Sequence, residues 1–376
     1  MDHIGVFKIL EKLVSFETVS PPGNEAEAAS YLANLLTAFG LQCRVQELGN
    51  DRANLIAVLD GKEPGPELML NGHLDVVPAQ GLWSSDPFEV KYSEDGKLFG
   101  RGTADMKGGV AAMCAAAMET ASEGGITRGR LKLLFVADEE CSNLGTRAYM
   151  KEYGPSDYGI IGEPTGLAVA AAHRGVSRDY IEFTAPARHA ALPSREKDAV
   201  EKMASFVLQI REINKKLAKL THPLLPSPGI SVTKLEGYEK DNVVPGKTRI
   251  LLDFRILPGM HHEAAVEILQ NGLALAGIAD ARIESHFYMP GGEISQEDPF
   301  VLLCAKKRQE ILKTEEPICA FDASCEQCFL VEHGTKTVIC GPGNLAQAHT
   351  VNEFINQQQI LQAVSLYKGI IKEILI

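Results

Sequence analysis

The sequence holds a single tryptophan among 376 residues, no long apolar run and no excess of basic residues. One tryptophan argues against an aromatic binding platform. A membrane-spanning helix needs about 18 or more mostly apolar residues in a row, and no run reaches that length, so no membrane span is expected. The 37 Lys and Arg stand against 49 Asp and Glu, a net charge of −12, so binding to nucleic acid is not expected either.

The first twenty residues also lack the basic and then apolar pattern of a secretory signal. We therefore expect a cytoplasmic protein whose eight cysteines stay reduced. Cys325 and Cys328 form one CxxC pair. A structural zinc site needs a second such pair, so the sequence leaves the role of these two thiols open.

A chain of this length suits two domains better than one core. In its first and last parts, apolar strand-like segments alternate with helical ones, and an acid or a histidine follows most strands. This order is typical of an α/β fold with a mostly parallel sheet, whose sites lie at the carboxyl ends of strands. The expected strands are 42–47, 54–59, 67–72, 131–137, 158–161 and 337–340, and the expected helices are 5–17, 25–39, one from about 107, 144–152, 300–312 and 356–375.

The pattern changes at about residue 174. Residues 175–289 show the order strand–helix–strand–strand–helix–strand, which predicts an inserted α+β domain of the ferredoxin-like type. Residues 1–174 and 290–376 then form the catalytic domain. From 174 to 289 the sequence has 16 Lys and Arg against 14 Asp and Glu, a net of +2, and the remainder has 21 against 35, a net of −14. Either the insert supplies cationic side chains to an anionic substrate, or its net charge differs from that of the remainder by chance.

Five clusters of acids or histidines follow the apolar runs. His73 and Asp75 lie two residues apart just past a strand, where His73 would be a metal ligand and Asp75 would hold its other ring nitrogen. The alternative is an ordinary pair of loop residues. Asp105 follows a glycine-rich stretch and would either bridge two metal ions or cap the next helix.

Glu139 and Glu140 are adjacent, so in an extended chain they point apart. One would then be a metal ligand and the other a general base; the alternative is an acidic helix N-terminus. Glu163 and His349 each follow a short strand, and taken singly each is more often a solvated acid or a hydrogen-bonded histidine. Taken together, the clusters predict a site for two divalent cations, Zn²⁺ first and Co²⁺ or Mn²⁺ as substitutes.

Five motifs carry a resemblance to metallopeptidase family M20, in order and spacing. They are HLDVVP (73–78), LFGRGTADMKGG (98–109), DEE (138–140), GEPT (162–165) and AHTVNEF (348–354), joined by Trp83 and the DPF at 86–88. The sequence most resembles the branch of acetylornithine deacetylase and succinyl-diaminopimelate desuccinylase.

The resemblance implies a role for each residue. One ion would be held by His73, Asp105 and Glu163, and the other by Glu140, Asp105 and His349, with Asp105 bridging. Glu139 would be the general base, Asp75 would orient His73, and the Asp105–Met106 peptide would be cis.

The insert resembles the family's lid, which also forms its dimer interface. His189 would stabilise the oxyanion, across a homodimer, and the alternative is an exposed loop histidine. Asn242 and Arg255 would hold the substrate carboxylate, although a strand-surface salt bridge is the alternative for Arg255.

The expected function is hydrolysis of the amide bond of an N-acyl amino acid by water activated between two zinc ions. Small N-acyl amino acids or peptides are the expected substrates. The alternatives are an aminopeptidase or dipeptidase of the same fold and a catalytically silent binding protein. Three departures from the family pattern leave the acyl group and amino acid open: Asp198 with the two residues after it, Pro186, and residues 321–329.

Overall fold

The computed structural model describes residues 5–193 and 196–376. The chain divides into two compact units, which are taken in turn. The first comprises the residues up to Ala171 together with Glu293–Ile376, and the second is Ala172–Gly292. These limits lie within a few residues of the boundaries at 174/175 and 289/290 that the sequence suggests.

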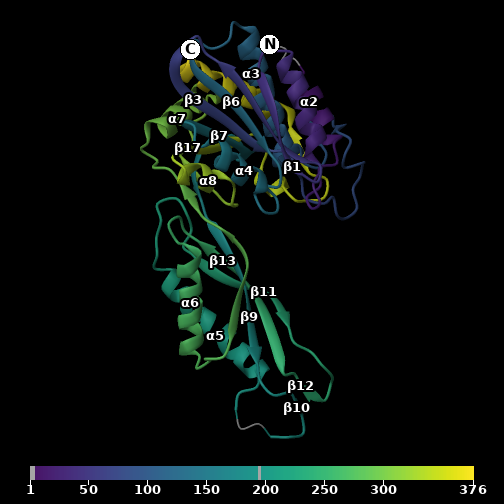
Figure 1. Ribbon diagram of the computed structural model, residues 1–376, viewed down its shortest axis with the longest axis vertical. Helices are drawn as coiled ribbons and strands as arrows, with labels where there is room; N and C mark the ends of the chain where they lie inside the picture. The colour runs from purple at the N-terminus through teal and green to yellow at the C-terminus, as the bar shows by residue number, and fades with distance from the viewer. Residues whose placement is uncertain (1–4, 194–195) are drawn as a thin grey trace. The chain divides into compact units, whose positions relative to one another are not determined.

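The first unit is built on a large sheet whose strand order is β1-β2-β6-β3-β7-β17-β8-β15, with β16 added beside β8. Its four central strands are parallel and lie side by side (Figure 1): β6 (Arg128–Val136), β3 (Glu63–His73), β7 (Tyr158–Pro164) and β17 (Lys336–Gly341). Antiparallel strands flank them, namely β1 (Gln42–Gly49) and β2 (Arg52–Asp60) on one side and β8 (Ala170–His173) on the other. Two short strands, β15 (Gly292–Glu293) and β16 (Cys319–Phe321), pair with β8. The mostly parallel α/β sheet predicted from the sequence is thus confirmed.

Helices cover both faces of this sheet. The alanine-rich α3 (Gly108–Ser122) is buried over most of its length and packs against α9 (Gln357–Leu375) and α1 (Val6–Val14). On the other face, α4 (Leu144–Tyr153) and α8 (Gln327–Glu332) contact each other and cover an apolar cluster that includes Met69, Leu134 and Ile339. The remaining helices are α2 (Glu25–Thr37), which packs on β1 and β2, and α7 (Pro299–Leu312), which packs on α9.

Short elements near the carboxyl edge complete the first unit. A small sheet pairs β18 (Phe354–Asn356), β5 (Lys97–Phe99) and β4 (Lys91–Tyr92). Two helical turns, Thr103–Lys107 and Leu345–Gln347, lead toward α3 and away from β17. The glycine-rich stretch before Asp105 is expected to follow a short strand that ends at Gly100, and β5 is that strand. The sequence patterns miss α8 and the other short strands, because two to six residues are too few to show a period.

The second unit is a four-stranded antiparallel sheet in the order β11-β13-β9-β14, with two helices on one face (Figure 1). Along the chain these are β9 (Gly175–Thr184), α5 (Ala199–Leu217), β11 (Gly229–Glu236), β13 (Lys247–Ile256), α6 (His262–Leu275) and β14 (Arg282–Met289). Alternate strand residues such as Ile181 and Leu252 pack against helix residues such as Phe206 and Leu269. A separate ladder joins β10 (Arg188–His189) to β12 (Val243–Val244). This is the strand and helix order that the sequence predicts for the insert.

Within the described residues, no helix is both long enough and apolar enough to cross a membrane.

Candidate metal centre

The carboxyl ends of the parallel strands bring the predicted ligands together. His73 is the last residue of β3, Glu163 lies near the end of β7, and Glu139 and Glu140 follow β6. Adjacent parallel strands end at the same edge of a sheet, so residues about 90 positions apart in sequence become neighbours.

Asp105 joins the two histidines. Its Oδ1 lies 3.2 Å from Nε2 of His73, and its Oδ2 lies 3.4 Å from Nε2 of His349. The two oxygens of one carboxylate thus face two imidazoles, which is the arrangement a bridging ligand requires. The Asp105–Met106 peptide bond is cis, as the resemblance implies.

Two other carboxylates each lie near one of the two histidines. Glu163 Oε1 lies 3.6 Å from Nε2 of His73, and Glu140 Oε2 lies 3.1 Å from Nε2 of His349. Among the residues that the structure describes, two groups have ligand atoms within 4.8 Å of one another: His73 with Asp105 and Glu140, and His73 with Glu139 and Glu163. Glu139 therefore lies on the His73 side of the site, close enough to be a ligand as well as a base.

A main-chain contact fixes the tautomer of His73. Its Nδ1 lies 2.9 Å from the main-chain oxygen of Asp75, which can only accept, so in the neutral ring Nδ1 carries the proton and Nε2 presents its lone pair. The Asp75 carboxylate also lies near Nδ1, and its part in holding the His73 ring stays a prediction. The nearest Asp75 carboxylate oxygen is 3.7 Å away, because that carboxylate has other partners.

Those partners are the amides of the two glutamates. The main-chain N–H groups of Glu139 and Glu140 donate to the two oxygens of Asp75, each over 3.1 Å. Asp75 is fully buried. Its carboxylate thus orients the turn that carries Glu139 and Glu140, while its carbonyl orients His73.

The charges in the site indicate that it is shaped for cations. Burial opposes ionisation of Asp105, yet hydrogen bonds from His349 and His73 hold its pKa below the usual range. The hydrogen bonds from His349 to Asp105 and Glu140 raise the pKa of that imidazole to about 10. Burial lowers the pKa of His73, but the contact with Asp105 and the charge of Glu163 outweigh it and raise that pKa well above its usual value. The surrounding carboxylates thus favour the protonated form of each imidazole. The added proton places a positive charge where a metal ion would bind.

Three glutamates complete this pattern. Burial raises the pKa of Glu139, of Glu140 and of Glu163, and negative neighbours raise each further. Groups of acids crowded in this way repel one another until a cation joins them. Two imidazoles with several carboxylates are a donor set that suits Zn²⁺, Co²⁺ or Mn²⁺, so the residues present fit the predicted metal ions.

The CxxC pair takes no part in this centre. Cys325 and Cys328 are buried and unpaired, and neither belongs to a possible metal-holding group among the described residues. Burial raises the pKa of both thiols well above the usual value. Thiols held neutral in this way are poor ligands and poor nucleophiles.

In the second unit, His189 and Asn242 are neighbours. The N–H of Ala191 donates to Nδ1 of His189 over 3.2 Å, so the neutral ring carries its proton on Nε2. Nδ2 of Asn242 lies 3.2 Å from that Nε2. Two N–H groups cannot bond to each other, so with the proton on Nε2 the pair forms a hydrogen bond when the amide is turned to present its oxygen. The ring is thereby held as a hydrogen-bond donor at Nε2.

Arg255 lies far from this pair within the same unit. Asn242 precedes β12 and β13, whereas Arg255 is the penultimate residue of β13. The eight residue steps from Lys247 to Arg255 alone span about 26 Å of strand. Nε of Arg255 donates to Asp253 Oδ1 over 2.7 Å, the strand-surface ion pair that the sequence left as an alternative.

Asp198 has a structural explanation. Its side chain accepts from the N–H of Glu201, and the Glu201 side chain accepts from the N–H of Asp198, so the pair forms a capping box at the start of α5. Asp198 also pairs with Arg188, next to His189. The departure from the family pattern thus stabilises the helix and anchors the segment that carries His189.

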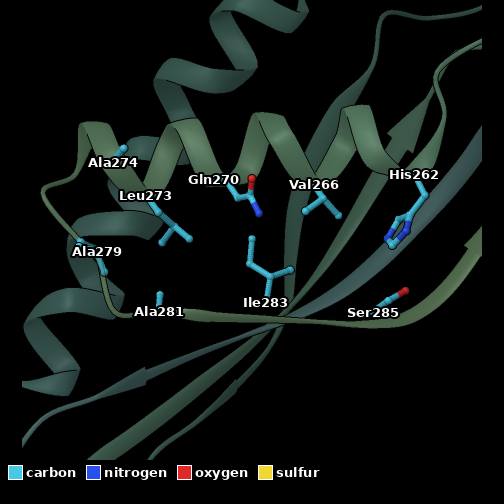
Figure 2. Close-up of a pocket in the computed structure, with 10 residues that line it drawn as sticks. His262, Val266, Gln270, Leu273, Ala274, Ala279, Ala281, Ile283 and Ser285 are labelled. Atoms are coloured by element: carbon cyan, nitrogen blue, oxygen red, sulfur yellow. The ribbon is translucent and has the colours of Figure 1, made fainter.

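A pocket of about 570 Å³ lies elsewhere in the second unit, between α6 and β14 (Figure 2). Val266 and Gln270 of α6 face Ile283 of β14 across it. None of the predicted catalytic or metal-binding residues lines this pocket.

Sequence reasoning missed two buried charged residues beside the metal centre. Glu353 is fully buried and contacts the turn that carries Asp105. Lys107, two residues beyond Asp105, is also fully buried and donates to the carbonyl of Phe16. Both lie inside motifs of the resemblance, but nothing in their spacing predicts their partners.

A mostly parallel sheet whose carboxyl edge gathers two histidines and several carboxylates defines a metal-dependent hydrolase. Residues 69–373 match the family described as Peptidase family M20/M25/M40, and the chain belongs to that family.

Individual relatives agree. The chain is 30% identical over 345 residues to an acetylornithine deacetylase of Pasteurella multocida, covering 88% of this chain and 86% of that protein. It is 25% identical over 395 residues to a probable succinyl-diaminopimelate desuccinylase of Staphylococcus epidermidis, covering 97% and 96%. The crystal structure of an M20 family metallo-carboxypeptidase from Sulfolobus solfataricus matches with a TM-score of 0.82 at 18% identity, covering 99% of both chains. The resemblance stated from the motifs is confirmed.

Proposed function

We propose that this protein hydrolyses the amide bond of an N-acyl amino acid, as the name of its deacetylase relative describes for that protein. The observation that carries the proposal is the position of Asp105, whose two oxygens face His73 and His349 separately. One carboxylate shared between two imidazoles suits a pair of cations, and a pair of cations suits hydrolysis.

We place one cation among His73, Asp105 and Glu163 and the other among Glu140, Asp105 and His349. Divalent ions bound there lower the pKa of a water molecule and polarise a carbonyl oxygen. Zn²⁺ is the ion we propose, because imidazole and carboxylate together suit it. The protonated Nδ1 of His73 leaves Nε2 free to face its cation.

Glu139 is the proposed general base. It follows β6 on the His73 side of the centre, and Asp75 holds its main-chain N–H. Burial and the charge of Glu163 raise its pKa, so it accepts a proton more readily than an exposed glutamate does. It takes the proton of the attacking water at its carboxylate and delivers it to the nitrogen of the leaving amine.

His189 and Arg255 complete the proposed site. The Nε2–H of His189 donates to the oxyanion that forms as the carbonyl carbon becomes tetrahedral. Arg255 binds the carboxylate of the substrate, and its bond to Asp253 holds the guanidinium in place. Asn242 is proposed to contact the same substrate beside His189.

The separation of Asn242 from Arg255 argues for a homodimer. One chain cannot bring both to one small substrate, so we propose that each site takes Arg255 from one chain and the His189–Asn242 pair from the other. β14 ends the sheet order and leaves one strand edge unpaired. That edge and the pocket beside α6 (Figure 2) are the surface we assign to the second copy.

Hydrolysis of a panel of N-acetyl, N-succinyl and N-formyl amino acids, assayed with added Zn²⁺, tests the function. Turnover of at least one acyl amino acid, with none of unblocked dipeptides, supports the proposal. Preference for unblocked dipeptides would favour the peptidase alternative. The cytoplasmic location stays a prediction that rests on the unpaired cysteines.

A further inference from the structure

Glu353 connects the two loops that carry the metal ligands of the second cation. It lies four residues after His349, and its side chain reaches the turn that contains Asp105. The sequence motifs predict no role for Glu353, and the proposed mechanism does not use it.

Four donors converge on this one carboxylate. The N–H groups of Ala104 and Asp105 donate to Oε1 over 2.8 and 3.1 Å. The N–H of Gly102 and Nη1 of Arg101 donate to Oε2 over 3.0 and 2.6 Å. Hydrogen bonds to a charged acceptor are about twice as strong as those between neutral groups, so this set defines the conformation of the turn.

Backbone pairing places Glu353 for this task. The strand β18 begins at Phe354 and pairs antiparallel with β5, with Phe354 opposite Phe99. The N–H of Gly100 then donates to the carbonyl of Glu353 over 3.0 Å. Pairing of β18 with β5 thus fixes the position of Glu353 along the chain, and its side chain then reaches the N–H of Asp105.

The turn has little freedom to adopt another arrangement. Gly102 has φ +82°, and a Cβ there would lie 2.6 Å from Val76. Glu353 is fully buried, so no water replaces the bonds it makes. Losing an acceptor here leaves buried N–H groups unpaired, which moves the chain that carries Asp105.

We propose that Glu353 is a positioning residue that sets the distance between Asp105 and His349, and with it the affinity for the second cation. This inference rests on the proposed two-cation site. Partners beyond the ligands themselves typically change metal affinity by about 10–100-fold when they are removed.

The test is a Co²⁺ titration of metal-free protein, followed by calorimetry and by the visible absorption of the bound ion. Glu353→Gln keeps the shape but presents an NH₂ group where N–H groups donate. We expect it to weaken at least one of two binding steps by about 10–100-fold and to change the absorption bands.

Glu67→Gln is the matched control. Glu67 also pairs with a largely buried cation, Lys132, but it lies on β3 several residues before His73. Its loss removes a similar ion pair and leaves the turn at Asp105 untouched, so both Co²⁺ affinities should stay at wild-type values.

A folded Glu353→Gln protein with wild-type affinities and absorption bands overturns the role of Glu353. If that variant does not fold, Glu353→Asp, which keeps the charge but is too short to reach all four donors, is held to the same criterion. A wild-type chain that binds fewer than two Co²⁺ ions defeats the proposed function itself, and the role of Glu353 with it.

Discussion

Asn242 and Arg255 stand at opposite ends of β13, although both are assigned to the substrate. The strand between them alone accounts for about 26 Å. His189, in contrast, lies 3.2 Å from the Asn242 amide. The second unit therefore holds the proposed substrate-binding residues in two separate groups, and the proposed dimer, in which the copies exchange one group, would bring both groups to one substrate.

Mixed dimers test this exchange. His189→Ala and Arg255→Ala should each lose most activity alone. When they are co-expressed, about half of the dimers carry one copy of each, and one of their two sites combines an intact His189 with an intact Arg255. We expect the mixture to recover roughly a quarter of wild-type turnover.

His189→Ala mixed with Asn242→Ala is the control for that experiment. These residues are neighbours, so every site in a mixed dimer lacks one of them and turnover should stay low. A His189→Ala and Arg255→Ala mixture that recovers nothing, although size measurements show mixed dimers, would place both residues in a single chain's site.

Glu139→Gln tests the general base. The substitution keeps the size of the side chain but removes its ability to take a proton, so kcat should fall by about 10²–10⁴-fold. Metal content should stay near wild type, because the ligand sets assigned to the two cations do not need Glu139. Elemental analysis and steady-state kinetics on the same preparation give both values. More than about a tenth of wild-type turnover would remove Glu139 from this role.

The convergence of the ligands was predictable from the sequence, whereas their hydrogen-bond partners were not. His73, Glu140 and Glu163 follow strands whose apolar runs identify them as neighbours in a parallel sheet, and strand ends meet at one edge. The partner of Glu353 is a set of main-chain N–H groups about 250 residues away, and main-chain donors leave no trace in residue identity. Only the three-dimensional path of the turn reveals them.

Asp75 shows the same limit within two residues. The HxD spacing predicted that its carboxylate would hold His73. The Asp75 carbonyl oxygen lies 2.9 Å from Nδ1 of His73 and the nearest carboxylate oxygen 3.7 Å, while that carboxylate also accepts from the amides of Glu139 and Glu140. Sequence periodicity predicts the side of the strand toward which a side chain points. It does not predict whether the main-chain oxygen or a carboxylate oxygen accepts a given hydrogen bond. Short strands such as β8, which reads Ala-Ala-Ala-His, were missed because alanine has no preference for strands.

Removal of metal should abolish turnover and lower the unfolding temperature together. Without cations, Asp105, Glu140 and Glu163 are buried close to one another and repel. A ligand that binds only the folded state stabilises it by about 2.7 kcal/mol at a hundred times its Kd, so adding Zn²⁺ or Co²⁺ should restore both properties. Thermal melts and assays of chelated and reloaded protein measure this. Full turnover after exhaustive chelation would contradict the two-cation site.

His349→Ala refines that experiment. His349 is assigned to the second cation only, and its side chain is 54% exposed, so its loss opens little of the core. We expect this variant to bind one cation where wild type binds two. Retention of both ions at wild-type affinity would show that His349 is not a ligand.

Glu25 is a buried acid that makes folding depend on pH. Both of its carboxylate oxygens are buried without a hydrogen-bond partner, and the nearest Arg52 nitrogen is 3.5 Å away. Burial, with the charge of Asp75, raises its pKa from 4.5 to about 7. The folded chain then holds a proton that the unfolded chain has released, so the stability that this group contributes is present below pH 4.5 and is lost as pH rises toward 7.

Glu25→Gln should therefore stabilise the protein at pH 8 and have little effect at pH 4.5, where wild-type Glu25 is itself mostly neutral. Because 1 kcal/mol shifts Tm by roughly 2–4 °C in chains of moderate size, an increase of several degrees at pH 8 is expected. Glu27→Gln, an exposed acid in the same first turn of α2, controls for the lost charge at the helix N-terminus. Equal shifts at both pH values, or a matching shift in the Glu27→Gln control, would show that Glu25 is ionised in the folded protein throughout this range.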